Sequence, residues 1–269
     1  MSSIIKDLQN FGSRIIRPIT NGGVESFRRV PSFNVGLGIC THRDVKAQVF
    51  DTLIMAKACP DPHIEILRMV GDALITRSRS KMASMFQASN MDILWLIDDD
   101  IVIDMLDLTR MMWQMWKDDL DIFGAPYVLK SETEKCFAIM TLEDKGSFPA
   151  GKGAPIQEIR YLSSGCMGIR KRVFKKLIET GVVHLCHESK DPYYPFFNEL
   201  EYNLNGKWIN LSEDWALCQR ARDAGFKVYC DFSVKVGHIG TIIYDWDNFF
   251  RPPKEKREGF DYNFDIQKY

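Results

Sequence analysis

The feature that most constrains the fold is the regular alternation of short apolar runs with longer helix-like segments in the first half of the chain. Strand-like runs cover residues 34–40, 64–70, 93–97 and 122–128, and helix-like segments cover residues 45–58, 73–89 and 105–116. This order is typical of a parallel sheet with helices on both faces. The run 93–97 is apolar throughout, as expected of a strand that is buried on both faces. We therefore predict a doubly wound α/β unit.

The second half of the chain has a less regular pattern. Strand-like segments cover residues 136–142, 159–162 and 226–236, and helix-like segments cover residues 170–179 and 212–224. Asn205 and Gly206 form a dipeptide that is typical of a tight hairpin turn. Ser212 is expected to be the N-cap of the last helix, which Gly225 follows. The aromatic stretch 193–197 has two interpretations: it borders an acceptor site, or it forms a small satellite core.

Length and composition favour one large domain over residues 33–250. The chain has 269 residues, of which 45% are hydrophobic and 26% are charged, as in folded proteins with a sizeable core. A net charge of -1 gives the whole protein no attraction to nucleic acid or to anionic membranes. Seven scattered cysteines without a CxxC pair argue against a disulfide framework and a structural zinc site. Since we find no signal peptide and no transmembrane segment, we expect a cytoplasmic protein.

The two ends of the chain are predicted to lie outside this domain. Residues 1–32 carry an apolar stripe at helical spacing, formed by Ile4, Leu8, Phe11, Ile15 and Ile19. We interpret this extension as an amphipathic helix that packs on its own domain or on a second subunit, which would make a homo-oligomer. The alternative is a helix that lies on a membrane surface. Residues 251–269 form a charged C-terminal tail.

Three consecutive carboxylates follow the apolar run 93–97, namely Asp98, Asp99 and Asp100. The carboxyl end of a buried parallel strand is where open α/β sheets bind ligands. Alternation along an extended chain would point Asp98 and Asp100 the same way. Two convergent carboxylates suit a hard divalent cation that also holds a diphosphate. The alternative is a solvated turn in which Asp99 or Asp100 caps the next helix.

The run 92–103 resembles the DxD segment of GT-A glycosyltransferases, in particular the inverting glycosyltransferase family two of viral and bacterial type. The resemblance implies that Asp98 and Asp99 lie near the nucleotide. It also implies that Asp100, together with Asp98, holds Mn²⁺ or Mg²⁺. The motif by itself has another interpretation, because haloacid-dehalogenase phosphatases also carry DxD after an apolar strand.

Glu213 and Asp214 occupy the first turn of the predicted helix 212–224. Carboxylates at this position are stabilised by the helix dipole, so simple capping is one interpretation. The segment also resembles the ED motif of the same glycosyltransferases. That resemblance implies that Asp214 is the general base for the acceptor hydroxyl, and that Glu213 binds the acceptor or orients the base.

His238 lies between two glycines in the sequence Val-Gly-His-Ile-Gly. The resemblance implies that this histidine is a third metal ligand, and imidazole is a sound ligand for manganese beside carboxylates. The alternative is a structural histidine with satisfied hydrogen bonds.

Four further residues are assigned to the nucleotide-sugar from the same resemblance. Thr41 and Arg43 follow the first strand and are expected to touch the base and ribose. Arg77 is our candidate for a diphosphate contact, with a surface arginine as the alternative. Gly165 lies in the segment 163–168, which resembles the small-residue loop under the donor sugar; an ordinary turn is the alternative.

The resemblance extends from Asn34 to Ile239. It implies an α/β fold of the GT-A type, in which a Rossmann-like nucleotide-binding half is fused to a mixed-sheet acceptor half in a single domain. The implied activity is metal-dependent transfer from a UDP- or GDP-sugar to an acceptor hydroxyl, with inversion, in the cytoplasm (the host cytoplasm if the protein is viral). The acceptor is a glycan, a protein or a modified nucleic-acid base.

Three alternatives to this activity stay open at the level of sequence. One is a retaining GT-A glycosyltransferase, since retaining enzymes share the DxD motif. A second is a metal-dependent phosphohydrolase or nucleotidyltransferase that uses Asp98 and Asp100. A third is a non-catalytic module that binds sugars or nucleotides.

Overall fold

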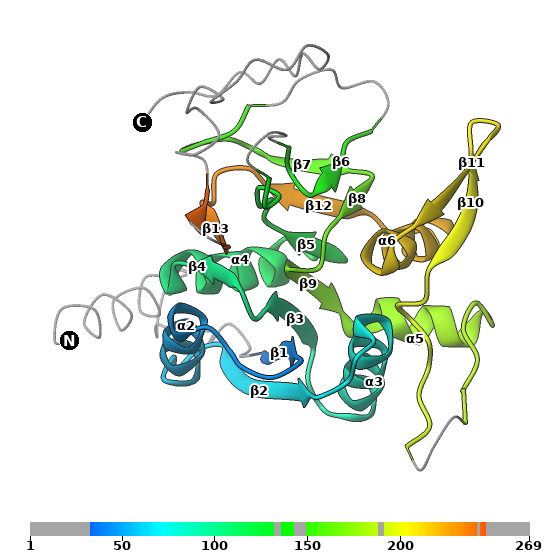
Figure 1. The fold of residues 1–269 in the computed structure, drawn as a ribbon, viewed down its shortest axis with the longest axis horizontal. Coiled ribbons are helices and arrows are strands. Elements are labelled where there is room, and N and C mark those ends of the chain that lie inside the picture. The colour runs from blue at the N-terminus through cyan, green and yellow to red at the C-terminus, as the bar shows by residue number, and fades with distance from the viewer. Residues whose placement is uncertain (1–32, 132–135, 143–148, 188–190, 241–242, 246–269) are drawn as a thin grey trace, which may run out of the picture.

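The computed structural model describes residues 33–131, 136–142, 149–187, 191–240 and 243–245. The predicted amphipathic helix in residues 1–32 and the charged tail 251–269 lie outside these residues and remain predictions. Figure 1 shows a central sheet with helices packed around it. Among the described residues, none of the helices is long and apolar enough to cross a membrane.

The main sheet has seven strands in the order β2-β1-β3-β9-β5-β12-β7. Its parallel members at one end are β1 (Asn34–Thr41), β2 (His63–Val70) and β3 (Ile93–Asp98). Strand β9 (Cys166–Arg170) runs antiparallel between β3 and β5 (Ile122–Gly124). Strand β12 (Val228–Asp231) is parallel to β5, and β7 (Ile156–Ile159) closes the sheet as an antiparallel edge. The sheet is therefore mixed.

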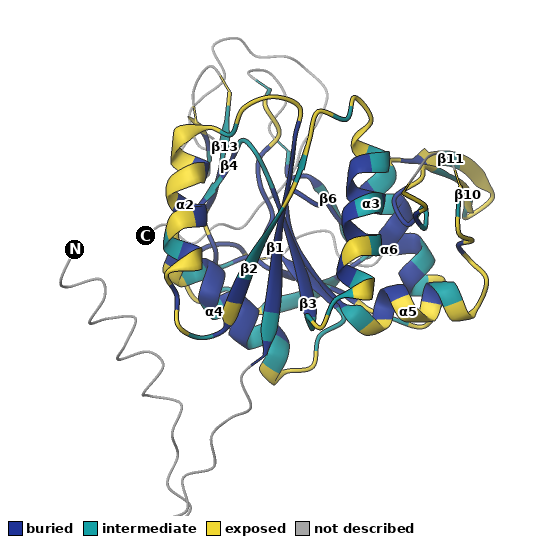
Figure 2. Cartoon of the chain, turned by 90° about the horizontal axis from the view of Figure 1, so that it is seen from below, coloured by how far each residue is buried: buried dark blue, intermediate teal, exposed yellow. Residues whose placement is uncertain are grey.

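Helices cover both faces of this sheet (Figure 2). One face carries α2 (Ala47–Lys57) and α4 (Met105–Lys117), and the other carries α3 (Ile75–Ala88), α5 (Lys171–Glu179) and α6 (Glu213–Asp223). Strand β3 contributes to both cores because its side chains alternate between the faces. Ile93, Trp95 and Ile97 pack in the core under α2 and α4, whereas Leu94 and Leu96 pack in the core under α3, α5 and α6.

Local sequence explains where several helices and turns begin and end. The Asp104 carboxylate accepts the Leu106 N–H at 2.8 Å and so caps the start of α4. Helix α6 ends before Gly225, which has a φ of 92° that favours glycine. The hairpin of β10 (Leu200–Leu204) and β11 (Lys207–Leu211) turns at Asn205 and Gly206, whose φ values are 52° and 82°. Two positive φ values are what a two-residue hairpin loop requires.

Smaller sheets complete the fold. Strand β13 (Val236–Ile239) lies between β4 (Ile101–Ile103) and β14 (Ile243–Tyr244). Strand β6 (Ile139–Met140) pairs with β8 (Tyr161–Leu162). The pairing of β13 with β4 brings residues 236–238 back beside the segment that follows β3.

The five helices predicted between residues 45 and 224 and the first three strands are confirmed, but the second half differs from the prediction in its strands. The predicted strand 226–236 is two strands, because the Asp231 carboxylate accepts the Ser233 N–H at 2.8 Å and turns the chain. The predicted strand 122–128 ends at Gly124, two residues before Pro126, which has no N–H for a ladder. The predicted strand 136–142 shrinks to β6, and the run 159–162 is divided between β7 and β8.

The segment 163–168, expected to be a loop, contains the start of the central strand β9. Gly168 obscured this strand, since glycine interrupts a strand pattern. The structure gives the reason for that glycine. A Cβ atom at Gly168 would lie 2.5 Å from the Trp95 ring of the neighbouring strand.

Candidate functional site

The three consecutive carboxylates lie at the carboxyl end of β3, in the middle of the sheet edge. Asp98 is the last residue of β3, and its N–H donates to the Gly165 carbonyl at 3.2 Å. All three carboxylates line a pocket of about 290 Å³, together with Thr41 from the end of β1. Asp72 and Arg79 line its other side. The ligand-binding edge predicted from the sequence therefore holds a pocket with a strongly acidic floor.

Arg79 joins the acidic strand end to the acidic helix start. Its side chain is only 6% exposed, and its Nη1 donates to Glu213 Oε1 at 2.6 Å while Nη2 donates to Asp98 Oδ1. Burial alone would lower the pKa of this guanidinium, but the adjacent Asp98 and Glu213 carboxylates outweigh burial and raise it. Arg79 therefore stays charged between the two carboxylates.

Sequence reasoning missed Arg79 and chose Arg77 instead. Arg77 is held by Asp72 through two hydrogen bonds, Nε to Oδ2 and Nη2 to Oδ1, both at 2.7 Å. This bidentate pair lowers the pKa of Asp72 to about 2, mainly through the hydrogen bonds from Arg77. The sequence does contain a signal for Arg79. Its spacing from Met82 and Phe86 places it on the same face of the helix as these two buried residues.

Asp100 and His238 lie side by side because β13 pairs with β4. The Ile239 N–H donates to the Asp100 carbonyl at 2.7 Å. The His238 Nδ1 lies 3.0 Å from the Val128 carbonyl, and its Nε2 lies 3.5 Å from Asp100 Oδ1. Because a carbonyl only accepts, Nδ1 carries a proton, and Nε2 is the ring nitrogen that faces the Asp100 carboxylate. Metal-binding histidines are commonly oriented in this way.

Lys130 also contacts Asp100, since its ammonium donates to Oδ2. Burial would raise the pKa of Asp100, but the neighbouring His238 and Lys130 outweigh burial and lower it. The carboxylate is therefore ionised and flanked by an imidazole and an ammonium.

These residues fit a divalent cation with two protein ligands. Within the described ranges, no three His, Cys, Asp or Glu side chains are grouped as a metal site. A carboxylate and an imidazole can nevertheless hold Mn²⁺ or Mg²⁺ when substrate phosphates and water supply the other ligands. The chain turns at residues 99–100, so the extended alternation assumed for Asp98 and Asp100 does not hold there. Both residues line the same pocket, and their carboxylates have different partners, Arg79 and Lys130.

Asp214 lies in the first turn of α6 and is 8% exposed. Its Oδ1 accepts from Ser212 Oγ at 2.6 Å and from the Trp215 N–H at 2.8 Å. Among the residues that the structure describes, its Oδ2 accepts only the Ser164 N–H, at 3.3 Å. Ser212 is the N-cap by position, but its hydroxyl bonds to Asp214 and not to the helix backbone. Asp214 is thus a fixed carboxylate whose Oδ2 retains accepting capacity.

Gly165 and Tyr127 pack against each other next to Asp98 and His238. A Cβ atom at Gly165 would lie 2.8 Å from the Tyr127 ring, so only glycine fits there. The same ring packs edge-on against His238, with 5.0 Å between ring centroids. Burial raises the pKa of Tyr127 well above its usual value, so its hydroxyl stays protonated. We did not identify Tyr127 from sequence, because a single tyrosine after a proline carries no distinctive signal.

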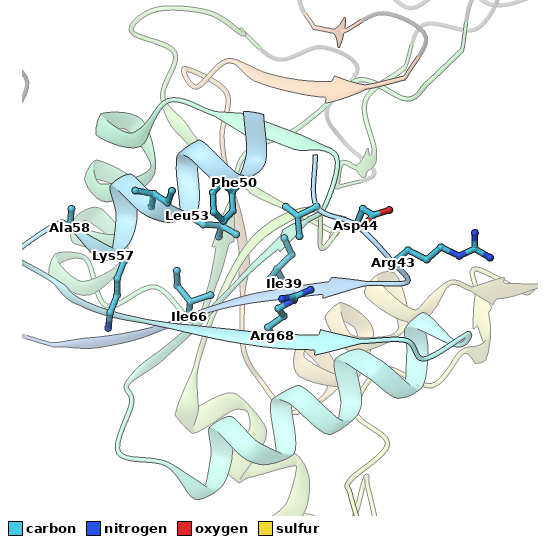
Figure 3. Close-up of a pocket in the computed structure, with 11 residues that line it drawn as sticks. Ile39, Arg43, Asp44, Phe50, Leu53, Lys57, Ala58, Ile66 and Arg68 are labelled. Atoms are coloured by element: carbon cyan, nitrogen blue, oxygen red, sulfur yellow. The ribbon is translucent and has the colours of Figure 1, made fainter. Parts of the chain in front are cut away.

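Thr41, Arg43 and Asp99 are distributed around the loop that follows β1. Thr41 Oγ1 donates to the Asp44 carbonyl at 3.0 Å and lines the acidic pocket. Burial raises the pKa of Asp99, which shares that pocket. Arg43 instead borders a second, largely apolar pocket of about 690 Å³ between α2 and the strands β1 and β2. In Figure 3 the Arg43 side chain extends away from the apolar lining of that pocket.

The aromatic stretch 193–197 belongs to the core, which favours the satellite-core interpretation over the acceptor-border interpretation. Phe196 and Phe197 are fully buried, and Tyr193 is 5% exposed. Phe196 packs against Phe174 of α5 with 4.8 Å between ring centroids. The Phe197 N–H donates to Ser80 Oγ of α3 at 3.1 Å, which fixes the stretch across two helices.

Comparison with solved structures shows the fold. The chain is similar to the crystal structure of A197 from STIV, with a TM-score of 0.52 and 15% identity over 77% of this chain and 86% of that chain. A structure of GalNAc-T7 with UDP, GalNAc and Mn²⁺ has a TM-score of 0.44 and 11% identity over 79% of this chain and 45% of that chain. Comparison with protein-family models and with curated proteins finds no match. The predicted single-domain GT-A-like α/β fold with a large mixed sheet is confirmed.

Proposed function

We propose that this chain is a glycosyltransferase that transfers a sugar from a UDP- or GDP-sugar to an acceptor hydroxyl with the help of a divalent cation. One observation carries the proposal: Arg79 pairs with both Asp98 and Glu213, so the acidic helix start is joined to the acidic strand end beside the pocket that Arg79 and Asp98 line. The two segments that resemble the DxD and ED motifs are thus adjacent in space, which simple capping or a solvated turn does not require.

The cation would be held by Asp100 and His238. A Mn²⁺ or Mg²⁺ ion there would supply the positive charge that stabilises a leaving nucleoside diphosphate. Asp98 lies nearer the nucleotide side of the pocket, with Thr41 and Asp99. Gly165 lies next to Asp98, and its lack of a side chain leaves room for the Tyr127 ring.

Asp214 would act as the general base. The proton of the acceptor hydroxyl passes to Oδ2, the acceptor oxygen forms a bond to the anomeric carbon, and the carbon–oxygen bond to the diphosphate breaks. The bonding electrons leave with the diphosphate. Because the hydroxyl attacks opposite the leaving group, the anomeric configuration inverts. The Ser212 and Trp215 hydrogen bonds to Oδ1 hold the carboxylate in one orientation for this transfer.

The alternatives differ in what they need from the fold. A haloacid-dehalogenase enzyme would carry its DxD on the first strand, whereas Asp98 and Asp100 follow the third strand of the chain. A retaining glycosyltransferase would not need Asp214 as a base. A non-catalytic module would bind the donor but release no sugar from it.

A thermal-shift screen tests the proposal. Purified protein is heated with Mn²⁺ and with UDP, GDP, ADP or CDP, or with their sugars, with the matching nucleoside monophosphates as controls. A ligand at 100 times its Kd stabilises by about 2.7 kcal/mol, which raises Tm by several degrees. The donor found in this way is then assayed for release of free sugar. If none of these ligands raises Tm in Mn²⁺, the proposal is wrong.

A further inference from the structure

The carboxylate assigned to the metal already has a cation. The Lys130 ammonium contacts Asp100 Oδ2, while His238 Nε2 lies 3.5 Å from Asp100 Oδ1. The Lys130 stem lies against Gly240, where a Cβ atom would come within 3.5 Å of its Cδ. Lys130 is 35% exposed and Asp100 is 22% exposed, so the pair lies at the rim of the site, where the lysine is free to move.

We infer that Lys130 is a positioning residue that neutralises Asp100 in the ligand-free protein and moves to the diphosphate when the metal and nucleotide bind. The inference rests on the proposed function. An ammonium and a divalent cation compete for the same carboxylate oxygens, and two positive charges that share one carboxylate repel each other. Metal alone must therefore displace Lys130 without offering it a new partner.

Metal that arrives with a diphosphate changes this balance. The phosphate oxygens give the displaced ammonium a new charge-assisted hydrogen bond within reach of its flexible stem. Lys130 thus opposes the binding of metal alone and favours the binding of metal with nucleotide. Such coupling is reciprocal: the nucleotide strengthens metal binding by the same factor by which the metal strengthens nucleotide binding. The site would then bind free cations weakly until the donor is present.

The competing interpretation is an ordinary surface ion pair. Partly exposed pairs of this kind contribute little to stability, and such a pair would have no effect on a neighbouring ligand. That interpretation predicts that removal of the Lys130 charge leaves metal and nucleotide affinities unchanged. The inference instead predicts two changes of opposite sign, which loss of a merely structural contact would not produce.

The experiment measures Mn²⁺ binding to the full chain without nucleotide, by the electron paramagnetic resonance signal of free Mn²⁺. It also measures UDP and GDP binding in saturating Mn²⁺ by calorimetry. The variants are Lys130→Met, Lys130→Arg, Asp100→Ala and, as a matched control, Lys207→Met on the exposed strand β11. We expect Lys130→Met to bind Mn²⁺ alone about tenfold more tightly and the nucleotide about tenfold more weakly. Lys130→Arg and Lys207→Met should resemble the wild type.

The outcomes separate this inference from the proposed function. Retention of Mn²⁺ binding by Asp100→Ala would remove the proposed metal site itself. Loss of Mn²⁺ binding by Asp100→Ala, with Lys130→Met indistinguishable from Lys207→Met, would leave that site intact and overturn the role of Lys130. Shifts of both affinities in the same direction for Lys130→Met would also overturn it.

Discussion

Arg79 and Glu213 form an ion pair with 2.6 Å between Nη1 and Oε1, although 134 positions separate them in the sequence. The same guanidinium contacts Asp98 at the end of β3. A single buried arginine therefore fixes the start of α6 relative to the carboxyl edge of the sheet. The alignment of the two acidic segments depends on this side chain.

Replacing this arginine should strongly destabilise the fold. Arg79→Met leaves the Asp98 and Glu213 carboxylates without their shared partner, and loss of one member of a buried ion pair lowers the free energy of unfolding by about 3–5 kcal/mol. Urea denaturation measures the loss. Arg77→Met is the matched control on the same helix, since its partly exposed pair with Asp72 should contribute about 1 kcal/mol or less. Equal losses for the two variants would contradict the role given to Arg79.

The pair of Arg77 with Asp72 should show its contribution in the pH dependence of stability. Arg77 holds the pKa of Asp72 at about 2, below its ordinary value of 3.8. A lowered carboxyl pKa in the folded state gives stability that is complete above the unfolded pKa and is lost as pH falls through the folded value. The stability difference between wild type and Arg77→Met should thus shrink between about pH 4 and pH 2. A difference that stays constant across this window would argue against the pair.

The close approach of Gly165 to Tyr127 should make any larger residue at position 165 destabilising. In Gly165→Ala the new Cβ lies 2.8 Å from the aromatic ring, so the ring or the strand must shift, at about 1–3 kcal/mol. Gly36→Ala is the control, because its new Cβ meets the ends of two flexible side chains that can move aside, Met91 at 2.7 Å and Leu67 at 2.9 Å. Combining Gly165→Ala with Tyr127→Leu should recover part of the loss. Thermal unfolding is measured for Gly165→Ala, Gly36→Ala, Tyr127→Leu and the double variant. Additive effects of the two substitutions in the double variant would refute the proposed contact between Gly165 and Tyr127 as the cause of the loss.

Asp214→Asn tests the general base. The amide oxygen can still accept from Ser212 and Trp215, but the group no longer accepts a proton at the position of Oδ2. Turnover should fall by about 10²–10⁴-fold while nucleotide binding stays nearly unchanged. Ser212→Ala, which removes only one orienting hydrogen bond, should have a much smaller effect. Near-normal transfer by Asp214→Asn would leave this residue as a helix cap and favour a retaining mechanism.

Much of the fold follows from the sequence, because its determinants are local. The apolar run of β3 and the Asn205–Gly206 turn identify their own structures, and the structure confirms both. Strand β9 was not predicted. Its Gly168 is required by close packing against the ring of Trp95, which lies far away in the sequence. Likewise the break after Asp231 depends on a side-chain hydrogen bond that composition does not reveal.

The candidate site shows the same division. Asp98, Asp100, Glu213 and Asp214 could be named from sequence because each lies at the end of a recognisable element. His238 was named with Asp100 from the resemblance, but Arg79 could not be named, since it reaches Glu213 only after the chain has folded. The expected alternation of Asp98 and Asp100 failed for a related reason: it assumes an extended chain, and the chain turns after β3.

The most direct test of the account is a calorimetric titration of UDP and GDP into wild type and Asp100→Ala, each in Mn²⁺ and in EDTA. We expect nucleotide binding only for the wild type in Mn²⁺, because Asp100 and His238 are proposed to hold the cation that would bind the diphosphate. Asp107→Ala, a partly exposed carboxylate on α4, serves as the control and should bind as the wild type does. Nucleotide binding of equal affinity by wild type and Asp100→Ala, in both Mn²⁺ and EDTA, would contradict the account.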